Sequence, residues 1–253
     1  PRDIFGSHDD SDHVYNTPRA WYMARCLNPS TMNWDGPDAD FTPLSDDIPW
    51  CMVPEKKVTI EDVKYVLSSH FQGTPYDPYA SYGDKSMKGA YRAIGVNRTD
   101  FLGIIQMRPD AEEDSRAIEW VAFASNVFNT AAPFYTDVEK VPEYFSNTTG
   151  DASTDNFYWA SRMIAAMADA SYSKSIFHIE RYQERVMSKG HEYINQYDEL
   201  LSKESDAEKR MQLRQEANEK IADMVKKETQ DTLNKVLYEL SNQMKNAYSR
   251  SDA

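Results

Sequence analysis

Thiol and imidazole groups are the side chains of this sequence best suited to nucleophilic or metal chemistry. The chain has two cysteines, Cys26 and Cys51, and five histidines. A thiolate beside an imidazole base can attack a carbonyl carbon, but neither cysteine lies in a segment that resembles a nucleophile turn. Because two cysteines are too few for a disulfide scaffold in a chain of 253 residues, we interpret them as buried thiols. A bridge between them stays open.

Motifs for bound metals and phosphate groups are missing from the sequence. It contains no Gly-rich phosphate loop, no His-Glu-x-x-His and no Cys-x-x-Cys, and we expect no cofactor and no metal site. His8 and His13 lie among aspartates that could attract a cation, but such a segment is typical of a solvated acidic loop. The amine of Pro1 could act as a base only at a mature terminus. Since the sequence begins at Pro1 rather than Met, we expect an upstream segment.

The charge balance excludes several classes of partner. Lys and Arg number 28 against 41 Asp and Glu, giving a net charge of −13, whereas binding to nucleic acid needs a basic surface. No apolar run approaches the roughly 20 residues that span a bilayer. The 40% of hydrophobic residues are enough for a sizeable core. We therefore expect a cytoplasmic globular protein with neither nucleic acid nor membrane as a partner.

The distribution of proline predicts two parts. All twelve prolines lie at or before Pro142, and a long stretch without proline permits long helices. We predict a strand- and loop-rich part over residues 1–150 and a helical part over residues 151–253. The fold class is therefore α+β.

In the first part, the clearest elements are one helix and two strands. A capping-box pattern at Thr59 and Asp62 predicts a helix over about 59–69. Residues 102–108 and 117–123 are rich in strand-forming residues and predict an antiparallel pair joined by a long polar loop. Both runs carry apolar residues on both faces, which is typical of central strands in a sheet covered on both sides.

In the second part, the pattern predicts two long helices. N-cap residue types at 153–156 begin a helix over about 156–201. A second capping box at Ser205 and Glu208 begins a helix over about 206–247, whose apolar residues form one stripe. Because the link between the helices is short and polar, we expect a long antiparallel helical hairpin.

Several segments resemble one family in the same order along the chain. They are residues 12–29 (DHVYNTPRAWYMARCLNP), 70–78 (HFQGTPYDP), 92–98 (RAIGVNR) with 106–108 (QMR), 117–120 (AIEW) with 132–135 (APFY), and 153–160 (STDNFYWA) with 179–183 (IERYQ). Together these segments resemble the C-terminal portion of bacterial dipeptidases of the lactobacillal dipeptidase A type, which are relatives of penicillin V acylase and bile salt hydrolase. The residues from Ser202 onward resemble nothing specific.

The resemblance implies an N-terminal-nucleophile (Ntn) hydrolase, an αββα sandwich with antiparallel sheets between helix layers. It implies dipeptides as substrates and a catalytic N-terminal cysteine, which this chain lacks. The missing N-terminal segment of the same protein would then be a partner, and a homo-oligomer stays open. Arg19 lies where related acylases place an arginine that orients the nucleophile and stabilises developing charge, so the resemblance implies a catalytic role for it. Tyr15 and Asn16 are the expected substrate-binding residues.

Two other functions stay open at this point. One is an amide hydrolase or acylase of the same superfamily, because the shape of the pocket selects the substrate. The other is a non-catalytic interaction module built on the helix over 206–247. An apolar stripe exposed on that helix would favour partner binding, whereas a stripe packed against residues 156–201 would be ordinary core.

Overall fold

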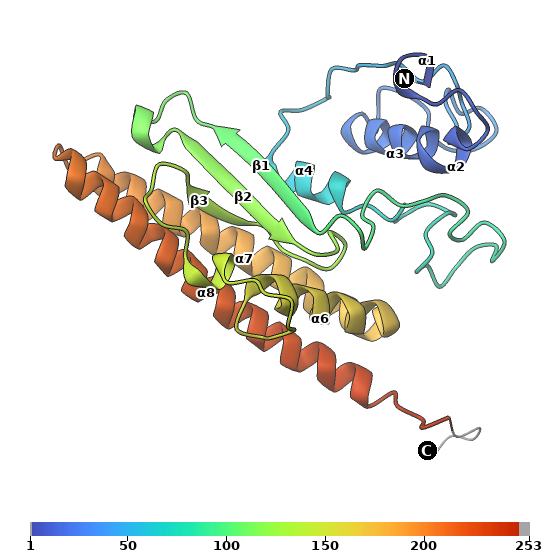
Figure 1. Cartoon of the computed structure of the whole chain (residues 1–253). Coiled ribbons are helices and arrows are strands. Elements are labelled where there is room, and N and C mark those ends of the chain that lie inside the picture. The colour runs from blue at the N-terminus through green and yellow to red at the C-terminus, as the bar shows by residue number, and fades with distance from the viewer. Residues whose placement is uncertain (1, 248–253) are drawn as a thin grey trace. The chain divides into compact units, whose positions relative to one another are not determined.

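The computed structural model describes residues 2–247, and the chain divides into two compact units (Figure 1). The first unit is Pro1–Val96 and the second is Asn97–Ala253. Residue 150, where the predicted boundary lies, falls inside the second unit. Along the chain it follows the last strand of the sheet and precedes the three long helices.

Short helices and long loops make up the first unit, and aromatic side chains form its core. Its helices are α1 (Arg2–Phe5), α2 (Asp12–Tyr15), α3 (Thr17–Leu27) and α4 (Ile60–Leu67). The residues buried together are Trp21, Tyr22, Trp34, Ile48 and Phe71. The rings of Tyr22 and Phe71 meet edge to face with centroids 5.5 Å apart, an arrangement that aromatic pairs prefer.

The helix predicted from the capping box is confirmed as α4. The Asp62 backbone N–H donates to Thr59 Oγ1 at 3.1 Å, and the Thr59 backbone N–H donates to Asp62 Oδ2 at 3.0 Å. These two bonds satisfy donors that a helix start leaves without partners. The local sequence is therefore enough to position the start of this helix.

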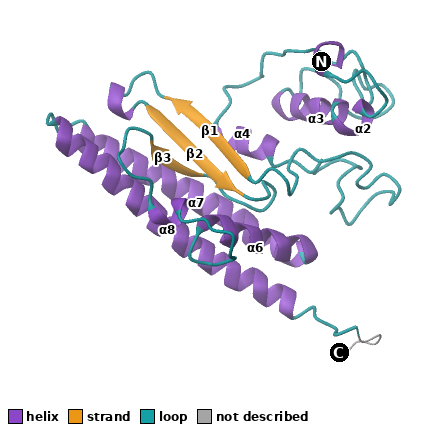
Figure 2. Ribbon diagram, viewed as in Figure 1, coloured by secondary structure: helices purple, strands orange, loops and turns teal. Residues whose placement is uncertain are grey.

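A three-stranded antiparallel sheet forms the base of the second unit, in the order β1-β2-β3 (Figure 2). Its strands are β1 (Phe101–Met107), β2 (Ala117–Phe123) and β3 (Ala132–Tyr135). The predicted pairing of the first two strands is confirmed, with Ile104 opposite Trp120. The short β3 was not predicted as a strand; it pairs with β2 and places Pro133 opposite Trp120.

Within this chain, β1 is neither central nor covered on both sides, unlike the prediction for it. It lies at the edge of the described sheet, and its residues alternate between exposed and half-buried. Phe101, Ile105 and Met107 are 53%, 69% and 62% exposed. Within β2, by contrast, Ile118 and Trp120 are buried. An edge strand has a neighbour on one side only, which hydrophobic pattern alone does not reveal.

Three long helices follow the sheet, α6 (Phe157–Ala170), α7 (Tyr172–Leu201) and α8 (Ala207–Ser241). The single helix predicted over 156–201 is therefore wrong, because the chain leaves helical geometry at Ser171 (φ −126°, ψ 32°). The Ser171 hydroxyl donates to the Met167 carbonyl at 2.8 Å, a local bond with which serine competes against a continuing helix.

The predicted antiparallel hairpin is confirmed by contacts between α7 and α8. Tyr182 meets Thr229 with their hydroxyl oxygens 2.7 Å apart, and the Tyr197 hydroxyl donates to Glu216 at 3.0 Å. The residue numbers of the partners therefore decrease along α8 as they increase along α7, which is the pattern of antiparallel helices. The N-cap of α8 is Asp206 rather than Ser205, since its carboxylate accepts from the Lys209 N–H at 2.9 Å.

The apolar stripe of α8 is mostly core. Ile221, Val225 and Val236 are fully buried, whereas Leu237 and Met244 are 52% and 69% exposed. The helix ends at Ser241, before the predicted residue 247. Because helices in proteins depend on burial of an apolar face, its end soon after the last buried residue is expected.

Other helices of the sheet unit are short: α5 (Glu143–Ser146) and the 3₁₀ turn Glu113–Ser115. Among the described residues, no helix is both long and apolar enough to cross a membrane.

Candidate functional site

The three predicted site residues lie together where α2 passes into α3. Tyr15 is the last residue of α2, Asn16 links the two helices, and Arg19 lies in the first turn of α3. Pro18, also in that turn, has a backbone angle suited to a helix start and no N–H that would lack a partner there. The local sequence therefore places these residues side by side.

Asn16 helps to hold a buried carboxylate. Its Nδ2 donates to Asp12 Oδ1 at 2.6 Å, and the Ser7 and His8 backbone N–H groups donate to the same carboxylate at 3.1 and 2.9 Å. Arg2 Nε donates to it as well, at 3.3 Å. These donors, with the bond from Asn16 as the largest cause, hold the pKa of Asp12 well below its usual range. The side-chain amide of Asn16 thus helps to fix Asp12, at the start of α2, in place.

Arg19 is half-buried and pinned by a backbone group of a distant residue. Its Nε donates to the Arg92 carbonyl at 3.1 Å, and the Arg92 N–H donates to the Val14 carbonyl at 3.0 Å. Burial lowers the pKa of Arg19, and the positive charge of Arg92 lowers it further. An arginine still stays protonated at neutral pH. Two guanidinium groups are thus brought close together.

The guanidinium group of Arg92 lies over the ring of Tyr15. The Arg92 guanidinium carbon lies 5.6 Å from the centre of the Tyr15 ring, a cation–π contact, and Tyr15 is 42% exposed. Arg92 was not among the predicted site residues, although it contacts two of them and begins the segment 92–98 that resembles the dipeptidase family. A signal was available, because arginine is well suited to binding carboxylates.

Neither cysteine has the surroundings of a nucleophile. Both Cys26 and Cys51 are free thiols; Cys26 is half-buried and Cys51 is exposed, so the prediction that both are buried is wrong for Cys51. Burial raises the pKa of the Cys26 thiol. A thiol is reactive as its thiolate, so Cys26 is poorly suited to attack a carbonyl. Pro1, the other candidate, lies outside the described residues.

No group of three or more His, Cys, Asp or Glu side chains that could hold a metal ion occurs within residues 2–247. His13 Nε2 lies 2.8 Å from Asp46 Oδ1, and Arg2 Nη1 donates to Asp46 Oδ2 at 3.0 Å. Asp46 is therefore hydrogen-bonded to His13 and paired with Arg2.

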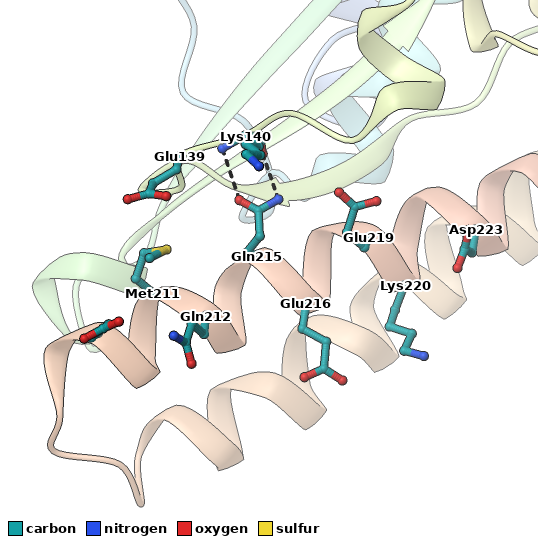
Figure 3. A pocket seen from close by; sticks show the side chains of 10 residues that line it. Glu139, Lys140, Met211, Gln212, Gln215, Glu216, Glu219, Lys220 and Asp223 are labelled. Atoms are coloured by element: carbon teal, nitrogen blue, oxygen red, sulfur yellow. Dashed lines mark hydrogen bonds between the residues drawn. The ribbon is translucent and has the colours of Figure 1, made fainter.

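The second unit has an open groove along α8 with a volume of about 790 Å³ (Figure 3). Five carboxylates line it, from Glu139, Glu208, Glu216, Glu219 and Asp223. At its edge, Gln215 accepts from the Lys140 N–H at 3.1 Å and donates to the Lys140 carbonyl at 2.9 Å (Figure 3). These contacts fix a loop onto α8. Solvated carboxylates on a helix surface need no ligand to explain them.

A smaller cavity of about 340 Å³ lies against the face of the sheet that carries Phe101, Val121 and Phe123, which we call the outer face. Its lining is largely apolar and includes Phe101, Val121, Phe123, Phe134 and Phe145. Glu119 lies in the middle of this face, since it pairs with Ile105 on one side and Phe134 on the other. Apolar surface of this kind on an open sheet is typical of a face that packs against another layer.

Comparison with known proteins assigns this chain to a class of peptidases. Residues 1–185 match the model of Peptidase family C69, and the chain belongs to that family. It is 45% identical to "Dipeptidase" of Bifidobacterium longum (strain NCC 2705), over 100% of this chain and 54% of that protein. It is also 45% identical to "Probable dipeptidase A" of Streptococcus pyogenes serotype M18 (strain MGAS8232), over 100% of this chain and 51% of that protein.

A more distant relative is "Dipeptidase A" of Lactobacillus helveticus, 32% identical over 94% of this chain and 48% of that protein. These matches confirm the resemblance to dipeptidases of the A type. The chain spans about half the length of the curated relatives it matches. Tyr15, Asn16, Arg19 and Arg92 all lie within the segment that matches the family model.

Proposed function

We propose that the intact protein is a cysteine-type dipeptidase whose N-terminal cysteine nucleophile lies outside this chain. The observation that carries the proposal is the family match over residues 1–185, together with relatives that are named dipeptidases at up to 45% identity. The poor fit of Cys26 to a nucleophile's role is consistent with it.

The proposed chemistry divides hydrolysis into two steps. The cysteine sulfur attacks the carbonyl carbon of the peptide bond, and the α-amine of the same residue takes up the thiol proton and passes it to the leaving amine. Water then attacks the thioester that has formed and releases the second product. In both steps, negative charge develops on the carbonyl oxygen and needs fixed donors.

Within this chain, Arg19 is the proposed catalytic residue. Among the described residues its terminal nitrogens make no hydrogen bond, while Nε is anchored to the Arg92 carbonyl. A charged group held in this way can stabilise an oxyanion with little reorganisation. The proposed substrate contacts are Tyr15, at the end of α2, and Asn16, which links α2 to α3; both precede Arg19 in the chain.

We further propose that the sheet is one layer of an Ntn αββα sandwich. Support comes from its outer face, where Phe101, Ile105 and Met107 of the edge strand expose apolar surface. Strands from the missing N-terminal segment would form a second sheet that stacks on this face. Another strand of that segment would pair with the edge of β1. The opposite face already packs on helices, since the Trp120 and His191 rings, on β2 and α7, are 4.6 Å apart.

The alternative of a helical interaction module has little support, because Ile221 and Val225 of the α8 stripe are buried within the unit. The acylase alternative is decided by substrate choice, so it is included in the test of the peptidase proposal.

The test is hydrolysis by the intact protein of a dipeptide and of a non-peptide amide. We expect release of free amino acids from the dipeptide, and a loss on the order of 10³-fold or more in kcat when the N-terminal cysteine is replaced by alanine. Faster turnover of the non-peptide amide would favour the acylase. Activity that survives removal of the cysteine would contradict the proposed nucleophile.

The sandwich has a separate test in the reactivity of an introduced thiol. Ile105 and Met244 are both 69% exposed in this chain. If a second sheet covers the outer face, the thiol of Ile105→Cys in the intact protein should react slowly with a maleimide, while Met244→Cys serves as the matched exposed control. Equal rates at the two positions would contradict a covering layer.

A further inference from the structure

Seven of the twelve arginines among the described residues form salt bridges with carboxylates. Those in salt bridges are Arg2, Arg25, Arg108, Arg162, Arg185, Arg210 and Arg214. Arg19 and Arg92 pair with no carboxylate among the described residues, even though Asp and Glu outnumber Lys and Arg by 41 to 28 in the whole chain. Arg98, Arg116 and Arg181 also form no salt bridge among the described residues, but Arg19 and Arg92 in addition lie close enough for the charge of Arg92 to lower the pKa of Arg19.

The buried carboxylate of the same segment, Asp12, is already committed to other donors. Asp12 is fully buried and accepts from Arg2, Ser7, His8 and Asn16. None of these donors is Arg19 or Arg92. Since bringing like charges together is unfavourable, this arrangement favours an anion supplied from outside the chain.

Arg92 is held so that its donors stay available. Its backbone N–H bonds to the Val14 carbonyl and its carbonyl accepts from Arg19, so both backbone groups are fixed. Its guanidinium lies over the Tyr15 ring. A guanidinium that stacks through its face still presents its N–H groups at its edge, in the fork geometry that suits a carboxylate.

We propose that Arg92 binds the C-terminal carboxylate of the dipeptide substrate, with Tyr15 as the platform that orients it. The proposal rests on the proposed dipeptidase function. In a dipeptide, the carboxylate belongs to the residue directly after the scissile bond, and adjacent Cα atoms lie only about 3.8 Å apart. The scissile carbonyl oxygen and the carboxylate are therefore close together in the substrate. Arg19 would bind the carbonyl oxygen, and the nearby Arg92 would bind the carboxylate.

This assignment makes Arg92 a determinant of specificity. A peptide that continues beyond its second residue has an amide where the dipeptide has a carboxylate, so Arg92 would be left facing a neutral group. A site built around a charged partner discriminates strongly against a ligand that lacks it. The pair of arginines would thus restrict the enzyme to short substrates that carry a free C-terminus.

The test compares the dipeptide Ala-Ala with its C-terminal amide, using the intact protein and measuring kcat and KM for each. For the free acid, we expect Arg92→Gln to lower kcat/KM by roughly 10- to 100-fold, mainly through KM, as loss of a charge-assisted bond predicts. For the amide, kcat/KM should stay unchanged. Arg92→Lys should restore part of the loss, because it keeps the charge without the fork.

The matched control is Arg25→Gln, on the same helix as Arg19, which removes an arginine already paired with Asp35 and should leave both substrates unaffected. Equal losses on acid and amide in Arg92→Gln would overturn the assignment, since Arg92 would then act on the reacting carbonyl or on the fold. Equal turnover of acid and amide by the unmutated protein would overturn it too, while leaving the peptidase proposal intact. Hydrolysis of neither would overturn both.

Discussion

The two units of the chain differ in how their structure is held. In Pro1–Val96, short helices and loops surround a small aromatic core, and polar bonds such as those on Asp12 fix the chain locally. In Asn97–Ala253, a sheet and three long helices share an extended core around Trp120 and Ile118. The proposed site residues lie in the irregular unit. Two of these residues, Tyr15 and Arg19, lie on short helices, and Arg92 lies on a loop. The regular unit supplies most of the burial.

The largest expected effect tests the burial in the sheet unit. Trp120 is 1% exposed at the centre of β2. Trp120→Ala should lower the free energy of unfolding by roughly 3–5 kcal/mol, because it removes a large buried side chain and leaves a cavity. Urea unfolding of the intact protein measures this. The control Leu237→Ala, at a residue of α8 that is 52% exposed, should cost far less, and equal costs would contradict the role of burial at Trp120.

A smaller effect should come from the close approach of α7 and β3. A Cβ added at Gly190 would lie 2.6 Å from Pro133 Cδ, whereas one at Gly150 would meet nothing within 4 Å. Gly190→Ala should therefore destabilise the protein by roughly 1–3 kcal/mol through overpacking. Gly150→Ala is the matched control in thermal unfolding, and a similar shift in both variants would show that the contact is unimportant.

The ion pair between the long helices gives a pH dependence. Burial raises the pKa of Glu228, but the bonds from Lys189 (Nζ) and Arg185 (Nε, 2.8 Å) outweigh it, so the pKa is lowered from 4.5. A lowered folded-state pKa contributes stability that is present above the unfolded value and is lost as pH falls through the folded value.

Glu228→Gln should therefore destabilise the protein by roughly 1.5 kcal/mol at pH 7. The difference from the unmutated protein should shrink as pH falls below about 4.5. Denaturant midpoints measured from pH 7 to pH 3 check this. The control Glu199→Gln removes an exposed pair with Lys203 and should change little. A gap that widens in acid would contradict the assignment.

The smallest expected effects compare helix starts in the two units. Asn156 caps α6, its Oδ1 accepting from the Trp159 N–H at 2.9 Å, and Thr59 caps α4. Each replacement by alanine should cost about 1 kcal/mol. Because α6 belongs to the larger core, we expect Asn156→Ala to lower the midpoint of global unfolding. Thr59→Ala should mainly raise hydrogen exchange around α4, and the reverse pattern would break the comparison of the two units.

Sequence reasoning succeeded where local patterns govern structure. The capping box of α4, the strand bounds of β2 and the existence of a helical hairpin follow from short-range chemistry and periodicity. The break at Ser171 was missed because one serine within a helical pattern is weak evidence against continuation. The strand β3 was missed because four residues that include Pro133 carry little strand signal.

What the sequence by itself determined was membership: ordered motifs pointed to the dipeptidase family, and the adjacent positions of Tyr15, Asn16 and Arg19 already placed them on one short stretch. Only the tertiary structure decided that Arg92, 73 residues from Arg19, lies beside it. It also decided which face of the sheet is left open. Both depend on how distant segments pack, and burial in three dimensions, unlike helix capping or strand alternation, leaves no fixed spacing in the sequence.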